Sequence, residues 1–388
     1  MHLSQGDISR PVPEFVATVI MPVRNEERFL GAALDAVLAQ DLPDGVLEVL
    51  VVDGRSTDRT REIAEERGRG ARFPVRILDN PERIAATALN IGIEAAQAEV
   101  VVRVDGHAEI PPDYVRRLLE VLERTGAEVA GGAVLPVGDG LYAQSVACAM
   151  RSPLGHGGAR FRARAGSKRE MDADTVAFPA YRKAVLVDVG AFDVEMVRNQ
   201  DDDVHLRLRN AGKRIVLVPS LVTTYHSRTT RVELFRQYFG YGFWKIVGWR
   251  KRGQLSSLRA LAPAALVASF GLCAALAVAS FPLVAGADWN GTNVDRPAQL
   301  VFAAVLALSV LVAAYLAYAI ILSCISLAVT PRPPGWRWLL APPARILPDM
   351  QIAYGLGFWW GILRLGHPPR RRGRRGRRAG QRPARSRK

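Results

Sequence analysis

In the stretch "VVRVDGHAEIPPDYV", Val101–Val115, an apolar run ends with an aspartate and a histidine. The run "EVVVRVD", Glu99–Asp105, is rich in β-branched residues and is predicted to be a buried strand. Residues i and i+2 of a strand face the same side, so Asp105 and His107 are expected to point at one object. A carboxylate and an imidazole suit Mn²⁺ or Mg²⁺ when phosphate oxygens and water complete the coordination. We therefore expect that object to be a metal-bound diphosphate.

The sequence before this stretch alternates strand-like and helix-like segments. The other strand-like runs are Val16–Pro22, Leu47–Asp53 and Val75–Asp79, and the helix-like stretches are Glu27–Ala39, Asp58–Arg67 and Ile84–Gln97. This alternation is typical of an α/β fold with a mostly parallel sheet covered by helices on both faces. Ligands bind such sheets beyond the carboxyl ends of the strands. The turn after Pro22, Asp53 and Asp105 all lie at such ends.

Asp53, in "VVDGRSTDRT", either terminates its strand or accepts hydrogen bonds from a ligand above the sheet, such as the N–H of a base. The second interpretation is preferred, whereas Asp58 is expected to cap the next helix. The run "NQDDD" holds three consecutive aspartates before a helix-like stretch. Acidic residues favour a helix N-terminus, but one aspartate suffices for a cap, so the three can include a general base.

Two histidines follow this acidic run. His205 is expected to be a polar position on the helix rather than a ligand. His226, in "SLVTTYHSRTT", is either a structural residue or the residue that closes the coordination sphere of the metal. The sequence leaves both interpretations of His226 open.

The second half of the chain has the composition of a membrane protein. Residues 260–287 and 297–331 carry no charge, and each run is long enough to cross a bilayer. Basic residues precede the first run, which places the catalytic domain and the basic tail on the cytoplasmic side of a plasma membrane. A further apolar segment, 336–364, suits an interfacial or re-entrant element, with a third span as the alternative.

Charge is concentrated at the C-terminus. The chain has 52 basic and 37 acidic residues among 388, and the last 19 residues hold 11 Arg or Lys and no acid. Residues 365–388 are therefore predicted to be a disordered Arg-rich tail that contacts anionic lipids. No basic and aromatic module accompanies it, so no dedicated nucleic-acid partner is expected. Residues 1–15 form an N-terminal extension without the apolar core of a signal peptide.

Four ordered stretches resemble the signatures of the inverting family 2 glycosyltransferases, which have the A-type nucleotide-sugar-binding fold. They are "VATVIMPVRNEERFLGAALDAVLAQ", "VVDGRSTDRT", "NPERIAATALNIGIEAAQAEVVVRVDGHAEIPPDY" and "NQDDDVHLRLRNAGKRI". More narrowly, "SPLGHGGARFR", "DTVAFPAYRK" and "RQYFGYGFWK" are similar to the branch that includes succinoglycan-type exopolysaccharide glucosyltransferases. The resemblance implies a catalytic domain over residues 16–235 and an interfacial amphipathic segment over 236–259.

The resemblance also implies roles for individual residues. The nucleotide and sugar would contact Pro22, Asn25, Glu26, Asp53, Arg83 and Asp105; the metal would be held by Asp105 and His107; the acceptor and membrane side would include Gln237 and Trp244. His226 is the candidate third metal ligand because of its place after the acidic run, not because of the resemblance. Asp201 would be the base, with Asp202 or Asp203 as residues that share its role, because Gln200 replaces the usual glutamate. Gln237 and Trp244 are too far apart for the Q-x-x-R-W motif of processive synthases.

The implied reaction transfers a sugar, typically glucose from UDP-glucose, to a polyprenyl-diphosphate-linked saccharide on the cytoplasmic face of the membrane. A polyprenyl-phosphate sugar transferase would share this chemistry, and a processive synthase would need a larger channel. From a different class, a non-catalytic membrane scaffold with an anion-binding tail is the remaining alternative. The set Asp53, Asp105, His107 and Asp201 favours an enzyme.

Overall fold

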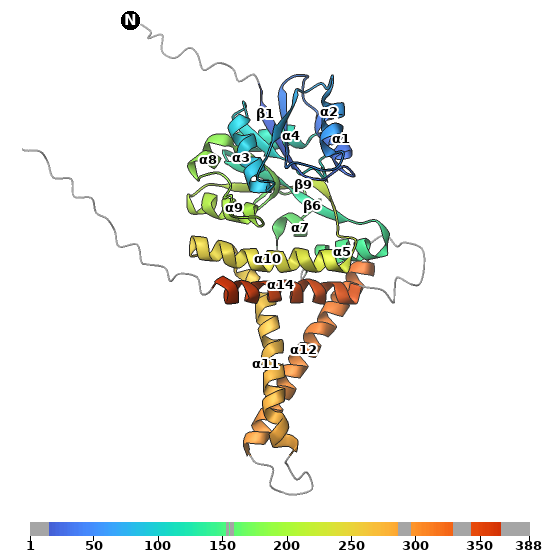
Figure 1. The fold of residues 1–388 in the computed structure, drawn as a ribbon, viewed down its shortest axis with the longest axis vertical. Coiled ribbons are helices and arrows are strands. Elements are labelled where there is room, and N and C mark those ends of the chain that lie inside the picture. Colours follow the sequence, from blue (N-terminus) through green and yellow to red (C-terminus); the bar gives the residue numbers. More distant parts are fainter. Residues whose placement is uncertain (1–14, 153–154, 156–158, 286–295, 329–342, 366–388) are drawn as a thin grey trace, which may run out of the picture.

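The computed structural model describes residues 15–152, 155, 159–285, 296–328 and 343–365. Most of the predicted N-terminal extension, the Arg-rich tail and the linker between the two apolar runs lie outside the described residues. The described chain forms an α/β body, a layer of two helices beneath it and a pair of helices that run away from both (Figure 1).

The α/β body is built on one nine-stranded sheet. Its strands are β1 (Ala17–Val23), β2 (Leu47–Asp53), β3 (Val75–Asp79), β4 (Val100–Arg103), β5 (Ala108–Glu109), β6 (Val129–Val137), β7 (Met171–Asp172), β8 (Ala177–Arg182) and β9 (Ile215–His226). The order is β3-β2-β1-β4-β8-β6-β9-β5, with β7 paired to β9. The four strands predicted from the sequence are the parallel half of this sheet.

The other half of the sheet corrects the prediction of a mostly parallel arrangement. Strand β8 lies between β4 and β6 and is antiparallel to both, whereas β6 and β9 are parallel, so the sheet is mixed. The segment "AFPAYR" of β8 contains Pro179, which cannot donate to a strand ladder, and it lacks the β-branched run that reveals β1 to β4. The β-branched pattern that located the other four strands is therefore missing from this segment.

Helices cover both faces of the sheet, as the continuous apolar strands predict. All seven residues of β2 are buried. Alternate residues enter different cores: Val49 and Val51 pack with α1 (Leu30–Leu38) and α4 (Tyr114–Thr125), and Leu50 and Val52 pack with α3 (Ala85–Ala95). The other helices that the structure describes in the body are α2 (Thr60–Gly68), α5 (Gly140–Arg151), α7 (Arg160–Ala163), α8 (Lys183–Asp188) and α9 (Gln200–Asn210).

Two helices, α10 (Arg231–Arg252) and α14 (Pro343–Leu365), lie side by side beneath the body (Figure 1). Glycines permit their close approach, since a Cβ at Gly242 would overlap the carbonyl oxygen of Tyr354 and one at Gly357 would overlap that of Phe239. The layer therefore includes most of the segments predicted as interfacial, 236–259 and 336–364, packed against each other. Residues 336–342 lie outside the described residues.

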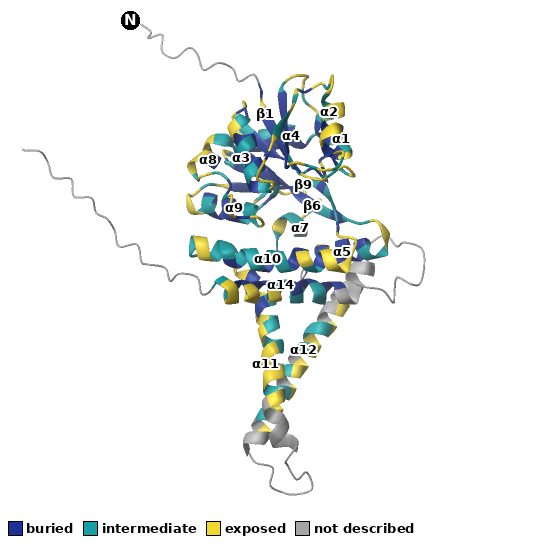
Figure 2. Ribbon diagram, in the orientation of Figure 1, coloured by how far each residue is buried: buried dark blue, intermediate teal, exposed yellow. Residues whose placement is uncertain are grey.

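Helices α11 (Leu261–Ala285) and α12 (Arg296–Ala328) extend from this layer with much of their surface uncovered (Figure 2). Within the described residues, Leu258–Leu276 is long and apolar enough to cross a membrane by length and composition, and the apolar part of α12, Val301–Ala317, is shorter. The first predicted span, 260–287, contains most of this helix. The second, 297–331, stays a prediction.

Replacing Gly242 with alanine tests the close packing of the two helices. The added methyl group overlaps the α14 backbone, so we expect a lower melting temperature, with overpacking that costs about 1–3 kcal/mol. The matched control is Gly271→Ala on α11, where nothing lies within 4 Å of the new Cβ. Thermal unfolding of the full chain in detergent should show a loss for Gly242→Ala and no loss for Gly271→Ala; equal melting temperatures would contradict the packing.

Candidate active site

The loops after β1 and β2 are tied together at the carboxyl edge of the sheet. The N–H of Asn25 donates to Ser56 Oγ at 2.9 Å, and Asn25 Oδ1 accepts from the N–H of Thr57 at 2.9 Å. Asn25 has φ 54°, a left-handed conformation that asparagine tolerates better than most residues. Pro22 stands just before this turn, paired with Val52 of β2. Asn25 therefore shapes the predicted nucleotide site through the backbone as much as through its own side chain.

Asp53 lies at the base of this site. It is only 3% exposed, and its Oδ1 accepts from the hydroxyl of Ser56 at 2.6 Å. The neighbouring Asn80 is also buried, and its Oδ1 has no hydrogen-bond partner among the described residues. Arg83 follows in the next loop, exposed and with φ 62°. The edge thus presents a buried carboxylate, an unpaired amide oxygen and an exposed guanidinium, which together suit a nucleotide.

Arg103 joins the predicted metal ligand to the predicted base. Its Nε and Nη2 bind the two oxygens of Asp105 at 2.7 and 3.1 Å, and its Nη1 binds Asp201 Oδ1. Burial lowers the pKa of the Arg103 guanidinium, but the two carboxylates raise it more, so the residue stays charged. Burial also raises the pKa of Asp105, but the charge of Arg103 lowers it more, so the carboxylate stays ionised.

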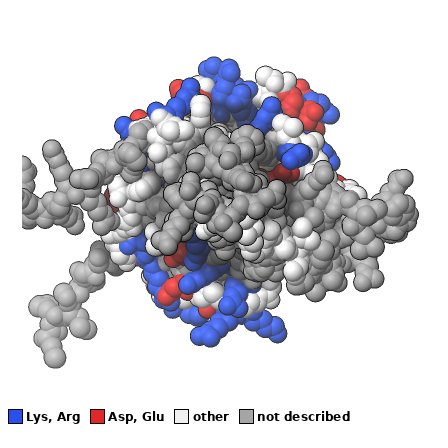
Figure 3. Space-filling view, turned by 90° about the horizontal axis from the view of Figure 1, so that it is seen from below, with Lys and Arg blue, Asp and Glu red and all other residues white. Residues whose placement is uncertain are grey.

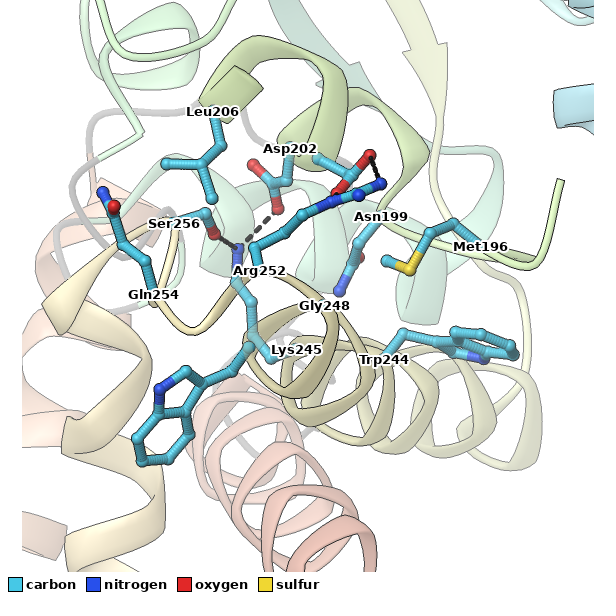
Figure 4. A pocket seen from close by; sticks show the side chains of 12 residues that line it. Met196, Asn199, Asp202, Leu206, Trp244, Lys245, Gly248, Arg252, Gln254 and Ser256 are labelled. Carbon is cyan, nitrogen blue, oxygen red and sulfur yellow. Dashed lines mark hydrogen bonds and ion pairs between the residues drawn. The ribbon is translucent and has the colours of Figure 1, made fainter. Parts of the chain in front are cut away.

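The three consecutive aspartates have three different environments. Asp202 binds Lys245 Nζ at 2.5 Å, and the same ammonium binds Ser256 Oγ at 2.7 Å (Figure 4). Asp203 is buried between Arg207 at 2.9 Å and Arg252 at 2.6 Å. Only Asp201 has its cationic partner on the sheet.

These environments separate the pKa values of the first two aspartates. Burial and the nearby Asp105 and Asp202 raise the pKa of Asp201, and the opposing effect of Arg103 is smaller. For Asp202, burial raises the pKa but Lys245 lowers it more. A base that works near neutral pH benefits from a raised pKa, so the electrostatics favour Asp201 over Asp202 as the base.

His107 lies beside Asp105 and is oriented by Glu26, whose Oε1 is 2.9 Å from Nδ1. Burial lowers the pKa of the imidazole, but Glu26 and Asp105 raise it more. His226 lies elsewhere: its ring stacks on Phe29 at 5.4 Å between centroids, and its Nε2 is 3.6 Å from Glu109. Within the described ranges, no three His, Cys, Asp or Glu side chains are close enough to hold a metal ion together. His226 is therefore not gathered with Asp105 and His107.

Two donors still fit a divalent ion that substrate phosphates help to hold. Mg²⁺ in particular is often bound by only one or two protein carboxylates with phosphate oxygens and water. Asp105 supplies an ionised carboxylate, and His107 keeps Nε2 available while Nδ1 is engaged by Glu26. At metal sites, a histidine ligand commonly donates a hydrogen bond from its other ring nitrogen to a carboxylate, as His107 can to Glu26.

A cavity of ≈ 520 Å³ connects these residues with the helix layer below. Its upper lining includes Arg103, Asp105, His107 and Asp201, and its lower lining includes Gln237, Tyr238, Tyr241, Met350 and Tyr354. Gln237 is buried and donates to the hydroxyls of Tyr225 and Tyr241, each at 2.9 Å. Trp244 lines a smaller neighbouring pocket with Lys245 and Met196 instead (Figure 4).

His205 is more deeply placed than a polar helix position. It is 0% exposed, with Nδ1 2.8 Å from the hydroxyl of Thr175 and Nε2 3.0 Å from that of Tyr181. Burial lowers its pKa to about 4, so the imidazole is neutral in the folded protein. His205 belongs to α9, and its two ring nitrogens contact the hydroxyls of Thr175 and Tyr181 rather than a ligand.

Sequence reasoning missed the cations that surround the acidic run. Arg103 lies two residues before Asp105, and strand alternation places both on one side, so its contact with Asp105 had a signal in the pattern. Lys245 and Arg252 had none, because their partners lie more than forty positions away in the chain.

Comparison with known proteins is consistent with this geometry. Residues 18–188 match the model for Glycosyl transferase family 2. The succinoglycan biosynthesis protein ExoA of Rhizobium meliloti (strain 1021) is 33% identical over 270 residues, which are 69% of this chain and 79% of that protein. The chain belongs to glycosyl transferase family 2. The family resemblance predicted from the sequence motifs is thereby confirmed.

Two other known proteins are similar to this chain over more than residues 18–188. A Methanococcus voltae family relative, dolichyl N-acetyl-alpha-D-glucosaminyl phosphate 3-beta-D-2,3-diacetamido-2,3-dideoxy-beta-D-glucuronosyltransferase, is 26% identical over 58% of this chain and 71% of its own length. The structure of the mannosyltransferase PcManGT from Pyrobaculum calidifontis in complex with GDP-Man and Mn²⁺ superposes with a TM-score of 0.55 at 20% identity, covering 89% of this chain and 87% of that one. The second likeness shows a shared fold.

Buried His205 predicts a pH dependence of stability in this glycosyltransferase. Its pKa is about 4 when folded against 6.5 when unfolded, so the unfolded chain binds the extra proton between these values. Stability from this group is complete above pH 6.5 and is lost as the pH falls toward 4, by up to about 1.4 kcal/mol per unit. Between pH 7 and pH 5, the melting temperature should fall less steeply for His205→Gln than for the wild type. This difference in slope is expected even if the two proteins have different melting temperatures at pH 7. Parallel curves would contradict the neutral, buried imidazole.

Proposed function

We propose that this family 2 glycosyltransferase transfers glucose from UDP-glucose to a polyprenyl-diphosphate-linked saccharide, with inversion at the anomeric carbon. One observation carries the proposal: Asp201 lines a cavity that is also lined by Asp105 and His107 and that reaches the helix layer beneath the α/β body. A donor bound above the sheet and an acceptor entering from the membrane would meet at this carboxylate. The product would serve exopolysaccharide or cell-surface glycan synthesis.

The donor would bind at the carboxyl edge of the parallel strands. Asp53 and Glu26 would contact the nucleoside, with Pro22 and Asn25 shaping the turn and Arg83 close to the phosphates. Support comes from the buried Asp53 carboxylate and from the fixed positive-φ turns at Asn25 and Arg83. Polar groups held by their own loops lose little entropy when a ligand arrives, which favours binding.

The chemistry would be a single in-line displacement. Asp201 would take the proton of the acceptor hydroxyl while that oxygen attacks the anomeric carbon, and the bond to the UDP oxygen would break. The electron pair leaves with UDP, and Asp201 later returns its proton to solvent. Arg103 would hold the carboxylate in place, and its charge favours the ionised form against the burial that raises the pKa of Asp201.

A divalent ion is part of the proposal. Asp105 and His107 would hold Mn²⁺ or Mg²⁺, which offsets the negative charge that develops on the departing diphosphate. Glu26 would fix the orientation of the His107 ring.

The helix layer would rest on the cytoplasmic face of a plasma membrane, with α11 and α12 as spans. Figure 3 shows Lys and Arg side chains around the rim of the surface seen from below, and the exposed Arg236 and Arg250 lie on α10. Basic residues near a membrane surface contribute about 1 kcal/mol each with anionic lipids. Exposed apolar side chains such as Val278 and Val310, 74% and 58% exposed, would face lipid.

Donor turnover tests the proposal. Full-length protein in detergent is assayed with UDP-, GDP- and dTDP-sugars, with Mn²⁺, Mg²⁺ or a chelator, and with or without polyprenyl-linked acceptors. We expect one UDP-sugar to be turned over in a metal-dependent way, and Asp201→Asn to lower kcat by about 10²–10⁴-fold. Product analysis distinguishes transfer to a lipid-linked saccharide from transfer to polyprenyl phosphate itself.

The matched control is Asp44→Asn, the same chemical change at a side chain that is 78% exposed and pairs with Arg72 at the surface. It should keep wild-type kcat, since an exposed ion pair contributes little. Wild-type kcat in Asp201→Asn would exclude this residue as the base. Failure of the wild type to bind or turn over any nucleotide sugar would leave the scaffold alternative.

A further inference from the structure

The membrane side of the cavity contains buried polar atoms that lack partners. Nε of Arg162 and the hydroxyl of Tyr238 are both buried, and neither has a hydrogen-bond partner in the part of the chain that the structure describes. Both residues line the ≈ 520 Å³ cavity, and Tyr238 is only 7% exposed. A buried donor without a partner costs free energy, which a bound ligand with acceptor oxygens would recover.

These two residues converge from different elements. Arg162 belongs to the short helix α7 of the α/β body, and Tyr238 to α10 of the helix layer. Burial raises the pKa of Tyr238, so its hydroxyl keeps the proton and remains a donor. The rings of Tyr238 and Tyr241 lie 5.6 Å apart between centroids, and Arg162 lines the same cavity, where its charge acts on both hydroxyls.

A polar path joins this cluster to the metal side of the cavity. The hydroxyl of Tyr241 and that of Tyr225 both accept from Gln237 at 2.9 Å, and the Tyr225 ring lies edge-on to His107 with centroids 6.2 Å apart. Arg228, also in the lining, acts electrostatically on both His107 and Tyr241. The cluster is therefore one end of the same cavity.

The charge of the lining suits an anion. Seven Arg or Lys side chains and four aspartates line the cavity. Of the aspartates, Asp105, Asp201 and Asp202 have the cationic partners described above, and Asp174 lies 3.7 Å from Arg209 and 3.8 Å from Arg259. None of these ion pairs involves Arg162 or Arg228.

We propose that Arg162 and Tyr238 bind the diphosphate of the lipid-linked acceptor. This inference rests on the proposed function and assigns a subsite within it. Asp53, at the predicted nucleoside end, is not part of the cavity lining, whereas Pro263 at the start of α11 and Met350 of α14 are. A lipid diphosphate arriving along the apolar helix α11 would meet Arg162 and Tyr238 before its sugar reached Asp201.

The experiment compares kinetics of full-length protein in detergent, with a polyprenyl-diphosphate-linked saccharide as acceptor. The variants are Arg162→Gln and Tyr238→Phe, and the control is Arg164→Gln, two residues further along at an exposed position outside the lining. Loss of a charge-assisted hydrogen bond should raise the acceptor KM about tenfold or more in Arg162→Gln, with a far smaller change in the donor KM. Tyr238→Phe should raise the acceptor KM less, and Arg164→Gln should match the wild type.

Inorganic pyrophosphate identifies the origin of the bound diphosphate. It should compete with the acceptor in the wild type, with an inhibition constant that rises about tenfold or more in Arg162→Gln. A raised donor KM with an unchanged acceptor KM would assign these residues to the donor diphosphate and overturn the proposal. So would an Arg162→Gln variant that is folded, by its melting temperature, and kinetically the same as Arg164→Gln.

A direct binding measurement separates this inference from the proposed function. Calorimetric titration of pyrophosphate at saturating UDP and Mg²⁺ does not require turnover. Suppose that the enzyme transfers sugar to no lipid acceptor, but pyrophosphate binds the wild type and binds Arg162→Gln at least about tenfold more weakly. The anion subsite is then supported, and the proposed acceptor is wrong. Equal pyrophosphate binding by wild type and Arg162→Gln would overturn the subsite itself.

Discussion

The pairing of three consecutive aspartates with cations from three elements is the constraint on which the site depends. Asp201 binds Arg103 of β4, Asp202 binds Lys245 of α10, and Asp203 binds Arg207 of its own helix α9 as well as Arg252 of α10. These bonds fix α9 between the sheet and the helix layer. Asp203 is buried, and an unpaired buried carboxylate would be costly, so its pairs restrict where α9 can sit. The same pairing leaves Asp201, whose pKa is raised, as the aspartate suited to accept a proton.

The helix layer of α10 and α14 also closes the cavity from below. Gly242 and Gly357 allow the backbones of α10 and α14 to come into contact. Residues of both helices line the lower side of the cavity, beneath the proposed catalytic residues. Because Gln237, Tyr238 and Tyr241 stand on the upper side of α10, the helix that contacts the membrane in the proposed function also presents polar groups to the acceptor. Membrane attachment and acceptor recognition would then use one element.

The features that short sequence patterns predicted are those that depend on residues close together in the chain. β-Branched runs located the four parallel strands, and their ends located Asp53, Asp105 and the turn at Asn25. Strand β8, with a proline and no such run, inserted between β4 and β6 and made the sheet mixed. The cationic partners Lys245 and Arg252 depend on the tertiary placement of α10, and the burial of His205 depends on Thr175 and Tyr181, which lie far from it in sequence. His226 shows the same limit, because its contacts with Phe29 and Glu109 are set by the fold.

The most direct measurement is the anomeric configuration of the transferred sugar, read from the proton coupling at the anomeric carbon by NMR of the product. One carboxylate base and a single displacement predict a β-linked product from an α-linked UDP-sugar. An α-linked product would require two displacements, or attack on the face from which UDP departs, and would contradict the role assigned to Asp201.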